Sequence, residues 1–189
     1  GKVLLKMGAK IKWRGSHIME IDGVEKLKGF EHSVEPDHLE AGTFIVAAAL
    51  TSGNVVVKNI NFDYLDLFLH KLEEIGVNIE RGENLVKILP SENFSSIRVQ
   101  ALPHPGFPTD LLPLATMLLI RANGRSLVHD PLYENRFQHL HELRKLGADI
   151  EVVDPHRALI FGKTDLIGNK INSNDIRSGA ALILAGLIA

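Results

Sequence analysis

One carboxylate of this sequence stands where a rigid loop meets an apolar segment. Asp110 ends the segment HPGFPTD at 104–110 and precedes the apolar run at 111–120. Proline is excluded from helix interiors and pushes the residue before it out of helical conformation, so the loop is expected to be stiff. An aspartate in this place can cap a helix by accepting hydrogen bonds from its first N–H groups. It can also act as a general base towards a hydroxyl within hydrogen-bond reach.

A cationic side chain follows in the segment LYENRF at 132–137. We predict that Asn135 caps a helix there and that Arg136 lies in its first turn. A cation at a helix N-terminus is unfavourable to the helix dipole, so Arg136 needs an anionic partner. That partner is either Glu134 or an anionic ligand, and the residues alone leave both possibilities open.

Arg177 repeats this arrangement at a third expected helix start, after Asn174 and Asp175. Two arginines beside helix N-termini would suit a phosphate or diphosphate, because the guanidinium group matches phosphate oxygens in a bidentate way. Taken alone, Arg177 is expected to form a salt bridge with Asp175 or another acid.

Several other chemistries are excluded or disfavoured. The absence of cysteine rules out disulfides and thiol nucleophiles within these residues. His139 and His141 are separated by two positions and point to different sides of a helix, so we expect packing or surface roles and no metal site. The sequence contains no GxxxxGK, GxGxxG or GxSxG motif, so it shows neither a glycine-rich phosphate loop nor a serine nucleophile elbow.

The elements that would position these side chains recur about every 70 residues. Each repeat reads as a helix end, a glycine at the helix C-terminus and a strand. The three copies are LLKMGAKI at 4–11, LEEIGVNI at 72–79 and LRKLGADI at 143–150. An aspartate before an apolar run recurs as well, at Asp37, Asp110 and Asp175. We predict units at approximately 8–75, 76–146 and 147–189, the third of them incomplete.

The helices of the repeat fall into two kinds. Residues 63–75 alternate apolar and polar positions at helical spacing, which is typical of a helix with one side in water. The segments 39–50, 111–120 and 180–189 are apolar on nearly all sides, which indicates enclosed helices. We therefore predict an α/β (α+β) fold over a single domain, 1–189, with apolar helices inside and sheets outside, as in an inside-out α/β barrel.

Composition limits the partners. The formal net charge is −2, which gives no reason to expect binding to nucleic acid or a membrane surface. The longest apolar run, 180–189, is too short to span a bilayer. We expect a cytoplasmic protein without a secretory signal. Because the third repeat stops early, we also expect the sequence to be a piece of a longer protein.

Three of these motifs together resemble the enolpyruvyl transferase family. They are PGFPTDLL at 105–112, YENRFQHLHELRKLGADI at 133–150 and NDIRSGAALILAG at 174–186, and EPDHLEAGTFIVAAAL at 35–50 is similar as well. The motifs look like the branch of the family that acts on UDP-N-acetylglucosamine. The resemblance implies transfer of the enolpyruvyl group of phosphoenolpyruvate to the 3-hydroxyl of that sugar, with release of phosphate, in peptidoglycan synthesis. The reaction that it implies requires neither a metal nor an organic cofactor.

The resemblance also implies roles for five residues. Asp110 would contact the sugar and take the proton of its 3-hydroxyl, while Leu132 and Tyr133 would line the uridine and sugar pocket. Arg136 and Arg177 would lie in the substrate and phosphoenolpyruvate site, with Asp110 and Arg177 as catalytic residues. The family fold implied here has two domains of three repeated units, which agrees with the repeat.

The sequence departs from the family pattern in two respects. His38 replaces a common arginine, and the family's second domain, which carries the proton donor and further groups that bind phosphoenolpyruvate, is not represented. Two alternatives therefore stay open. The chain could be a non-catalytic domain that only folds or weakly binds a UDP-sugar, or it could belong to the branch that acts on shikimate 3-phosphate.

Overall fold

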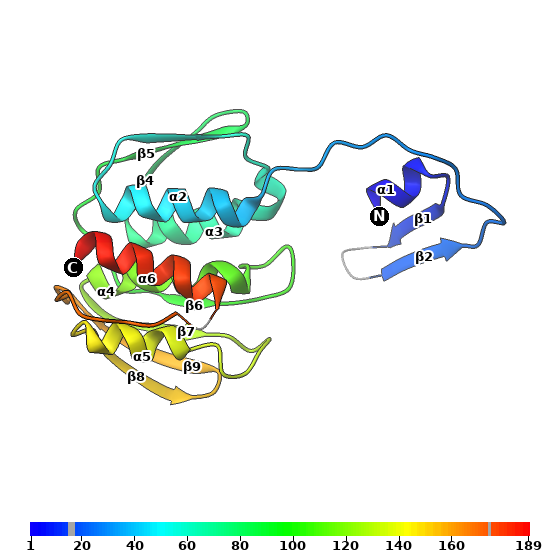
Figure 1. The fold of residues 1–189 in the computed structure, drawn as a ribbon. Coiled ribbons are helices and arrows are strands. Elements are labelled where there is room, and N and C mark those ends of the chain that lie inside the picture. The colour runs from blue at the N-terminus through cyan, green and yellow to red at the C-terminus, as the bar shows by residue number, and fades with distance from the viewer. Residues whose placement is uncertain (15–17, 174) are drawn as a thin grey trace. The chain divides into compact units, whose positions relative to one another are not determined.

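The computed structural model describes residues 1–14, 18–173 and 175–189, and the chain divides into two compact units, Gly1–Glu35 and Pro36–Ala189 (Figure 1). The single domain expected over 1–189 and the boundaries of the repeat units remain predictions.

The first unit is a short helix followed by a β-hairpin. Helix α1 (Lys2–Lys6) leads into strands β1 (Lys10–Arg14) and β2 (Ile18–Asp22), which pair antiparallel with Ile11 opposite Ile21. Gly8 has a φ of +94°, so the turn between α1 and β1 uses the left-handed region that favours glycine. The predicted sequence of helix end, glycine and strand is confirmed here.

The second unit begins with two helices packed on a three-stranded antiparallel sheet, in the order β3-β5-β4. The elements are α2 (His38–Leu50), β3 (Val55–Lys58), α3 (Phe62–Ile75), β4 (Asn78–Arg81) and β5 (Leu85–Leu89). Helix α3 buries the residues that its periodicity predicted, among them Leu65, Phe68 and Leu72. Gly76 ends this helix with a φ of +111°.

The remainder of the second unit is built on a four-stranded sheet in the order β6-β7-β9-β8. Its elements are β6 (Arg98–Gln100), the 3-10 helix η1 (Thr109–Leu111), α4 (Leu112–Arg121), β7 (Gly124–His129), α5 (Gln138–Lys145), β8 (Asp149–Asp154), β9 (Arg157–Gly162) and α6 (Ile176–Ile188). Strand β6 is parallel to β7, and the other neighbours are antiparallel.

Apolar helices form the middle of the second unit. Helices α2, α4 and α6 contact one another, α2 also packs on the first sheet, and α4 also packs on the second (Figure 1). Every residue of α4 from Leu112 to Ile120 is buried, as its uniform apolarity predicted. The mixed α/β class is confirmed, and so is the enclosure of α4. The prediction of enclosed helices is wrong in part for α2 and α6, because Phe44 is 56% exposed and Ile183 and Leu187 are 70% and 58% exposed. Closure into a barrel remains a prediction.

One glycine allows η1 to lie close to α2. A Cβ atom on Gly42 would lie 2.7 Å from Cδ2 of Leu111, which is closer than van der Waals contact allows. Leu111 is fully buried, so a larger residue at position 42 would force the side chain of Leu111 and its neighbours to shift. Within the described residues, no helix is long and apolar enough to cross a membrane.

Candidate functional site

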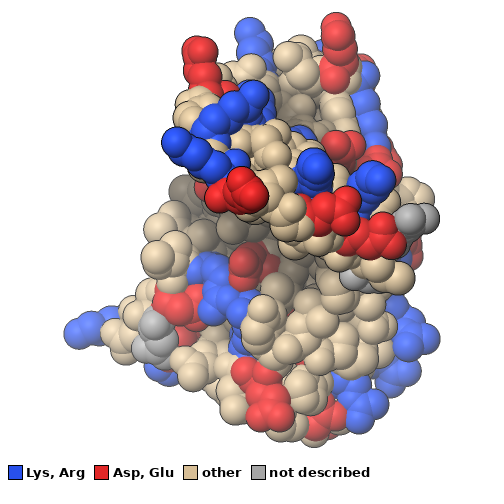
Figure 2. All heavy atoms as spheres, turned by 90° about the vertical axis from the view of Figure 1, so that its right-hand side faces the viewer, with Lys and Arg blue, Asp and Glu red and all other residues tan. Residues whose placement is uncertain are grey.

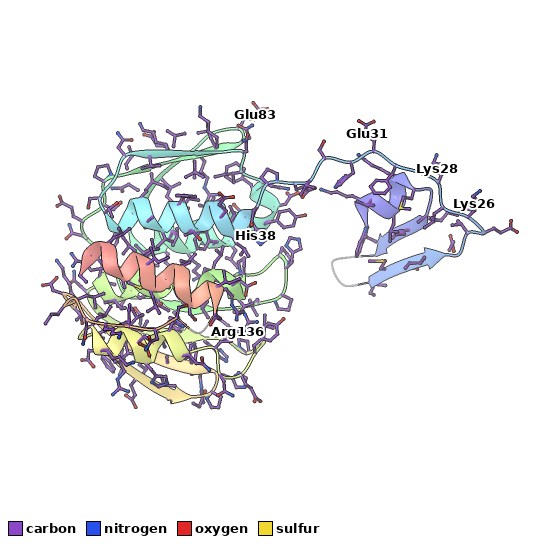
Figure 3. All side chains as sticks on the ribbon, in the orientation of Figure 1. Lys26, Lys28, Glu31, His38, Glu83 and Arg136 are labelled. Atoms are coloured by element: carbon purple, nitrogen blue, oxygen red, sulfur yellow. The ribbon has the colours of Figure 1, made fainter. Side chains whose placement is uncertain are left out.

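Helix starts gather at one end of the second unit. Figure 1 shows α2 and α6 beginning on the same side, and Figure 3 shows the labelled side chains of His38 and Arg136 at that end. The structure brings Asp110, Arg136 and Arg177 together there, although 67 positions separate Asp110 from Arg177. Three separate motifs of the sequence thus meet in one place.

A single carboxylate oxygen of Asp110 accepts from both arginines. Its Oδ1 atom lies 2.8 Å from Nη1 of Arg136 and 3.0 Å from Nη1 of Arg177. The side chain of Asp110 keeps 37% of its surface exposed, so the cluster is accessible from solvent. The partner of Arg136 is therefore Asp110, whereas Glu134 was the protein partner considered from the sequence.

Asp110 does not cap a helix, and that expectation is wrong. Residues Thr109–Leu111 form η1, and the N-cap of α4 is Leu111, which makes no side-chain cap bond. Pro113 occupies the second helical position and lacks the N–H group that a capping side chain would accept from. The carboxylate of Asp110 is consequently left for the arginines.

The predicted helix start at Arg136 is also wrong. Helix α5 begins at Gln138, and its N-cap is Phe137 without a side-chain cap bond. Asn135 has a φ of +58° and lies in the loop. The buried ring of Phe137 fixes the chain where the helix begins, and Arg136 remains on the loop side, where its side chain reaches Asp110.

Arg177 behaves as its surroundings predicted. Asp175 caps α6 by accepting from the N–H groups of Arg177 and Ser178, and its Oδ1 also lies 3.2 Å from Nε of Arg177. Arg177 therefore bridges Asp175 and Asp110. Asn174, which begins the motif at 174–186, lies outside the described residues.

Electrostatics keep both aspartates ionised. Burial raises the pKa of Asp110, but the hydrogen bonds and charges of Arg177 and Arg136 outweigh that effect and hold this pKa below its usual range. Burial likewise raises the pKa of Asp175. Hydrogen bonds from Ser178 and from Arg177 lower it to about 2.

The loop at 132–137 borders the same cluster. The guanidinium carbon of Arg136 lies 3.8 Å from the ring centre of Tyr133, which is a cation–π contact. Tyr133 is 51% exposed and Leu132 is 36% exposed, so both offer apolar surface to solvent beside the charges. The structure thus places all five residues assigned through the resemblance around one site.

Two further residues of this site, Asp130 and Thr109, were not identified from the sequence. Asp130 is 1% exposed, and its carboxylate accepts from the hydroxyl of Thr109 and from the N–H groups of Leu132 and Tyr133. The signal available was Asp followed by Pro directly after a strand, a pattern in which the aspartate often bonds the backbone two residues on.

In the described parts of the chain, no group of three or more His, Cys, Asp or Glu side chains that could hold a metal ion is found. His139 is buried within α5, burial lowers its pKa to about 4, and its Nε2 atom lies 3.5 Å from the hydroxyl of Thr116. His141 is exposed, which confirms the different sides predicted for the pair. His38 stacks on Tyr64 with 5.4 Å between ring centres.

The positive charge available to a ligand is local. Acidic and basic side chains lie next to one another on the face drawn in Figure 2. Behind the ion pairs is a cavity of about 10 Å³, which is close to the space that one water requires. The side chains of Asp110, Arg136 and Arg177 are themselves partly exposed to solvent.

Comparison with known proteins places the chain in a family. The family model described as EPSP synthase (3-phosphoshikimate 1-carboxyvinyltransferase) matches residues 1–189. The chain belongs to the EPSP synthase family. The enolpyruvyl transferase NikO from Streptomyces tendae, a solved structure of this fold, is similar with a TM-score of 0.89 and 25% sequence identity, over 98% of this chain and 44% of that one.

Relatives within the EPSP synthase family carry a more specific name. UDP-N-acetylglucosamine 1-carboxyvinyltransferase from Halothermothrix orenii is 46% identical over 98% of this chain. UDP-N-acetylglucosamine 1-carboxyvinyltransferase 2 from Geobacillus kaustophilus is 44% identical over 99% of it. The chain spans 44% of the length of each of these relatives.

Proposed function

We propose that this chain is part of an enolpyruvyl transferase that moves the enolpyruvyl group of phosphoenolpyruvate to the 3-hydroxyl of UDP-N-acetylglucosamine, a step of peptidoglycan synthesis. The observation that carries the proposal is the cluster in which Asp110 meets Arg136 and Arg177 at 2.8 and 3.0 Å. A carboxylate suits the removal of a hydroxyl proton, and two guanidinium groups suit a substrate with phosphate and carboxylate charges. The names of the relatives support the choice of substrates.

In the proposed reaction, Asp110 takes the proton of the 3-hydroxyl of the sugar while the oxygen of that hydroxyl forms a bond to C2 of phosphoenolpyruvate. A donor outside this chain adds a proton to C3, which gives a tetrahedral intermediate. That intermediate then loses a proton from C3 and its phosphate from C2, leaving the enol ether. Arg136 and Arg177 stabilise the negative charge of phosphate and carboxylate as it shifts, which is usually a large part of catalysis.

The ion pairs give this mechanism an order of events. In the unliganded cluster both arginines hold Asp110 in its ionised form and keep its pKa low, which makes it a weak base. An incoming phosphate or carboxylate competes for the same guanidinium groups. Once the arginines turn to that anion, the carboxylate of Asp110 regains basicity close to the hydroxyl that it must deprotonate.

The remaining parts of the proposal follow from the family. Leu132 and Tyr133 offer apolar surface to the uridine and sugar. The second domain of the parent protein would supply the proton donor and further groups for phosphoenolpyruvate, and the reaction as proposed uses neither a metal nor an organic cofactor. On this view the chain alone binds substrate weakly at most and lacks transferase activity.

The test is phosphate release by the parent protein and by the 189-residue chain, each with phosphoenolpyruvate and one acceptor. We expect release by the parent with UDP-N-acetylglucosamine and none by the chain alone. Release only with shikimate 3-phosphate would instead establish a 3-phosphoshikimate 1-carboxyvinyltransferase, the activity named in the description of the family. Release with neither acceptor would contradict both activities and leave a binding domain.

A further inference from the structure

Asp130 is a buried carboxylate at the junction of the two loops that carry the site. It follows β7 directly and is only 1% exposed. Its own backbone is fixed to the turn between β8 and β9, because its N–H donates to the carbonyl of His156 at 2.8 Å and its carbonyl lies 2.8 Å from Nδ1 of His156. The side chain therefore projects from a rigid part of the second sheet.

The two oxygens of this carboxylate face different loops. Oδ2 accepts from the hydroxyl of Thr109 at 2.5 Å, next to Asp110 in the sequence. Oδ1 accepts from the N–H groups of Leu132 and Tyr133 at 3.0 and 3.3 Å. One side chain thus joins the loop of the base to the loop of the proposed sugar pocket.

The hydroxyl of Thr109 connects the carboxylate of Asp130 to the guanidinium group of Arg136. It has one proton, which it gives to Asp130, and its lone pairs are left to accept from Nη1 of Arg136 at 3.2 Å. Because a carboxylate is an acceptor only, Asp130 sets the direction of this hydroxyl. Arg136 is thereby held between Thr109 and Asp110.

We infer that Asp130 is a positioning residue of the transferase site, which fixes Thr109, Arg136 and the backbone at 132–133 in one arrangement without touching substrate. This inference rests on the proposed function for its effect on turnover. The contacts of Asp130 themselves do not depend on it.

The decisive variant is Asp130→Asn, which keeps the shape and removes one acceptor. If the amide nitrogen faces Thr109, the hydroxyl must accept and its proton points at Arg136, which has no acceptor. If the nitrogen faces the other loop, it meets the two N–H donors of Leu132 and Tyr133. Neither orientation satisfies both sides, so one loop must shift.

In the parent enzyme we expect Asp130→Asn and Thr109→Val each to lower kcat/KM at least tenfold, through kcat and the KM for phosphoenolpyruvate. The double variant should lose no more than the worse single variant, because both changes break one connection. Thr109→Ser keeps the hydroxyl and should restore most activity. The matched control is Asp165→Asn, a surface aspartate whose change should leave turnover unaltered.

Hydrogen exchange separates this inference from the proposed function. The amides of Leu132 and Tyr133 should exchange faster in Asp130→Ala, which removes both acceptor oxygens, and stay protected in Asp165→Asn, whatever reaction the enzyme performs. Unchanged exchange at both amides, or losses in kcat/KM that add in the double variant, would overturn the inference. If Asp130→Asn does not fold, the pair Thr109→Val and Thr109→Ser decides: equal activity in the two contradicts the role of the hydroxyl.

Discussion

Asp37 and Asp110 occupy equivalent places before apolar helices, yet their side chains bind different groups. At the start of α2, Asp37 accepts from the N–H groups of Leu39 and Glu40 at 2.8 and 3.4 Å and so closes the helix end. At the start of α4, Asp110 makes no such bond and accepts from Arg136 and Arg177 instead. The same position in the repeat thus caps a helix in one copy and pairs with two arginines in another.

The difference comes from three residues around the second helix start. Pro108 and the turn of η1 move the N-cap of α4 one residue past Asp110, to Leu111, and Pro113 removes one of the donors that a cap requires. Arg136 then reaches the carboxylate from a loop. Because no N–H group of α4 forms a hydrogen bond to the carboxylate of Asp110, that carboxylate can bind other groups.

The largest effect is expected from neutralising Asp110. In the parent enzyme, Asp110→Asn should lower kcat more than tenfold, because the amide cannot accept the proton of the hydroxyl. The same exchange at the helix cap, Asp37→Asn, should leave kcat within twofold, since Asn caps a helix as well as Asp does. Steady-state kinetics of the two variants measure the contrast. Equal kcat values for them would remove the distinction between the two helix starts.

The next effect concerns the pKa of Asp110. Arg177→Gln should raise this pKa, since Arg177 and Arg136 hold it below its usual range against the opposing effect of burial. The ionised form exists above the pKa, so the acid side of the pH profile of kcat/KM should move to higher pH. Carbon NMR of the carboxyl group reports the same shift without any assay of activity.

The same variant should raise the KM for phosphoenolpyruvate about tenfold or more, which is the effect typical of losing a hydrogen bond to a charged group. Arg121→Gln is the matched control, because Arg121 pairs with the exposed Asp165 at 2.9 Å. It should move neither the pKa of Asp110 nor the KM. A pKa of Asp110 that stays constant in Arg177→Gln contradicts the electrostatic account.

Much of the fold was predictable because it depends on neighbours in sequence. The period of α3, the uniform apolarity of α4 and the glycines at the ends of helices are local signals, and the structure confirms them. The pairing of strands was not predictable. β3 pairs with β5, so this sheet joins strands from two predicted repeat units, and no local pattern specifies that partner.

The candidate site was also predictable only in part. Asp110, Arg136 and Arg177 were found through their motifs, and the motifs say which residues matter but not which atoms meet. The cap assigned to Asp110 failed because the pattern of Asp before an apolar run ignores Pro113, which lies inside that run. Asp130 was missed because its importance lies in contacts with Thr109 and with the backbone of another loop.

A smaller effect is expected from Asp175, which both caps α6 and holds Arg177. Asp175→Ala should lower the free energy of unfolding by about 1 kcal/mol at pH 7, the usual loss for a helix cap. Since the pKa of Asp175 is lowered to about 2, its ionic contribution is complete above about pH 4 and is lost as the pH falls towards 2. Urea unfolding of both proteins between pH 7 and pH 3 should show the difference narrowing. A difference that widens on acidification contradicts this role.

The smallest effect returns to the start of α2. Asp37→Ala should lower the free energy of unfolding by about 0.5 to 1 kcal/mol. The N–H groups of Leu39 and Glu40 lose the carboxylate as acceptor, but this helix end is exposed, so water can replace it. Asp37→Asn should cost almost nothing, since the amide oxygen can take the same two bonds. Urea unfolding distinguishes the two variants at neutral pH. If Asp37→Asn were as destabilising as Asp37→Ala, the charge of Asp37 rather than its cap bonds would be what α2 requires, and the two helix starts would differ less than their hydrogen bonds indicate.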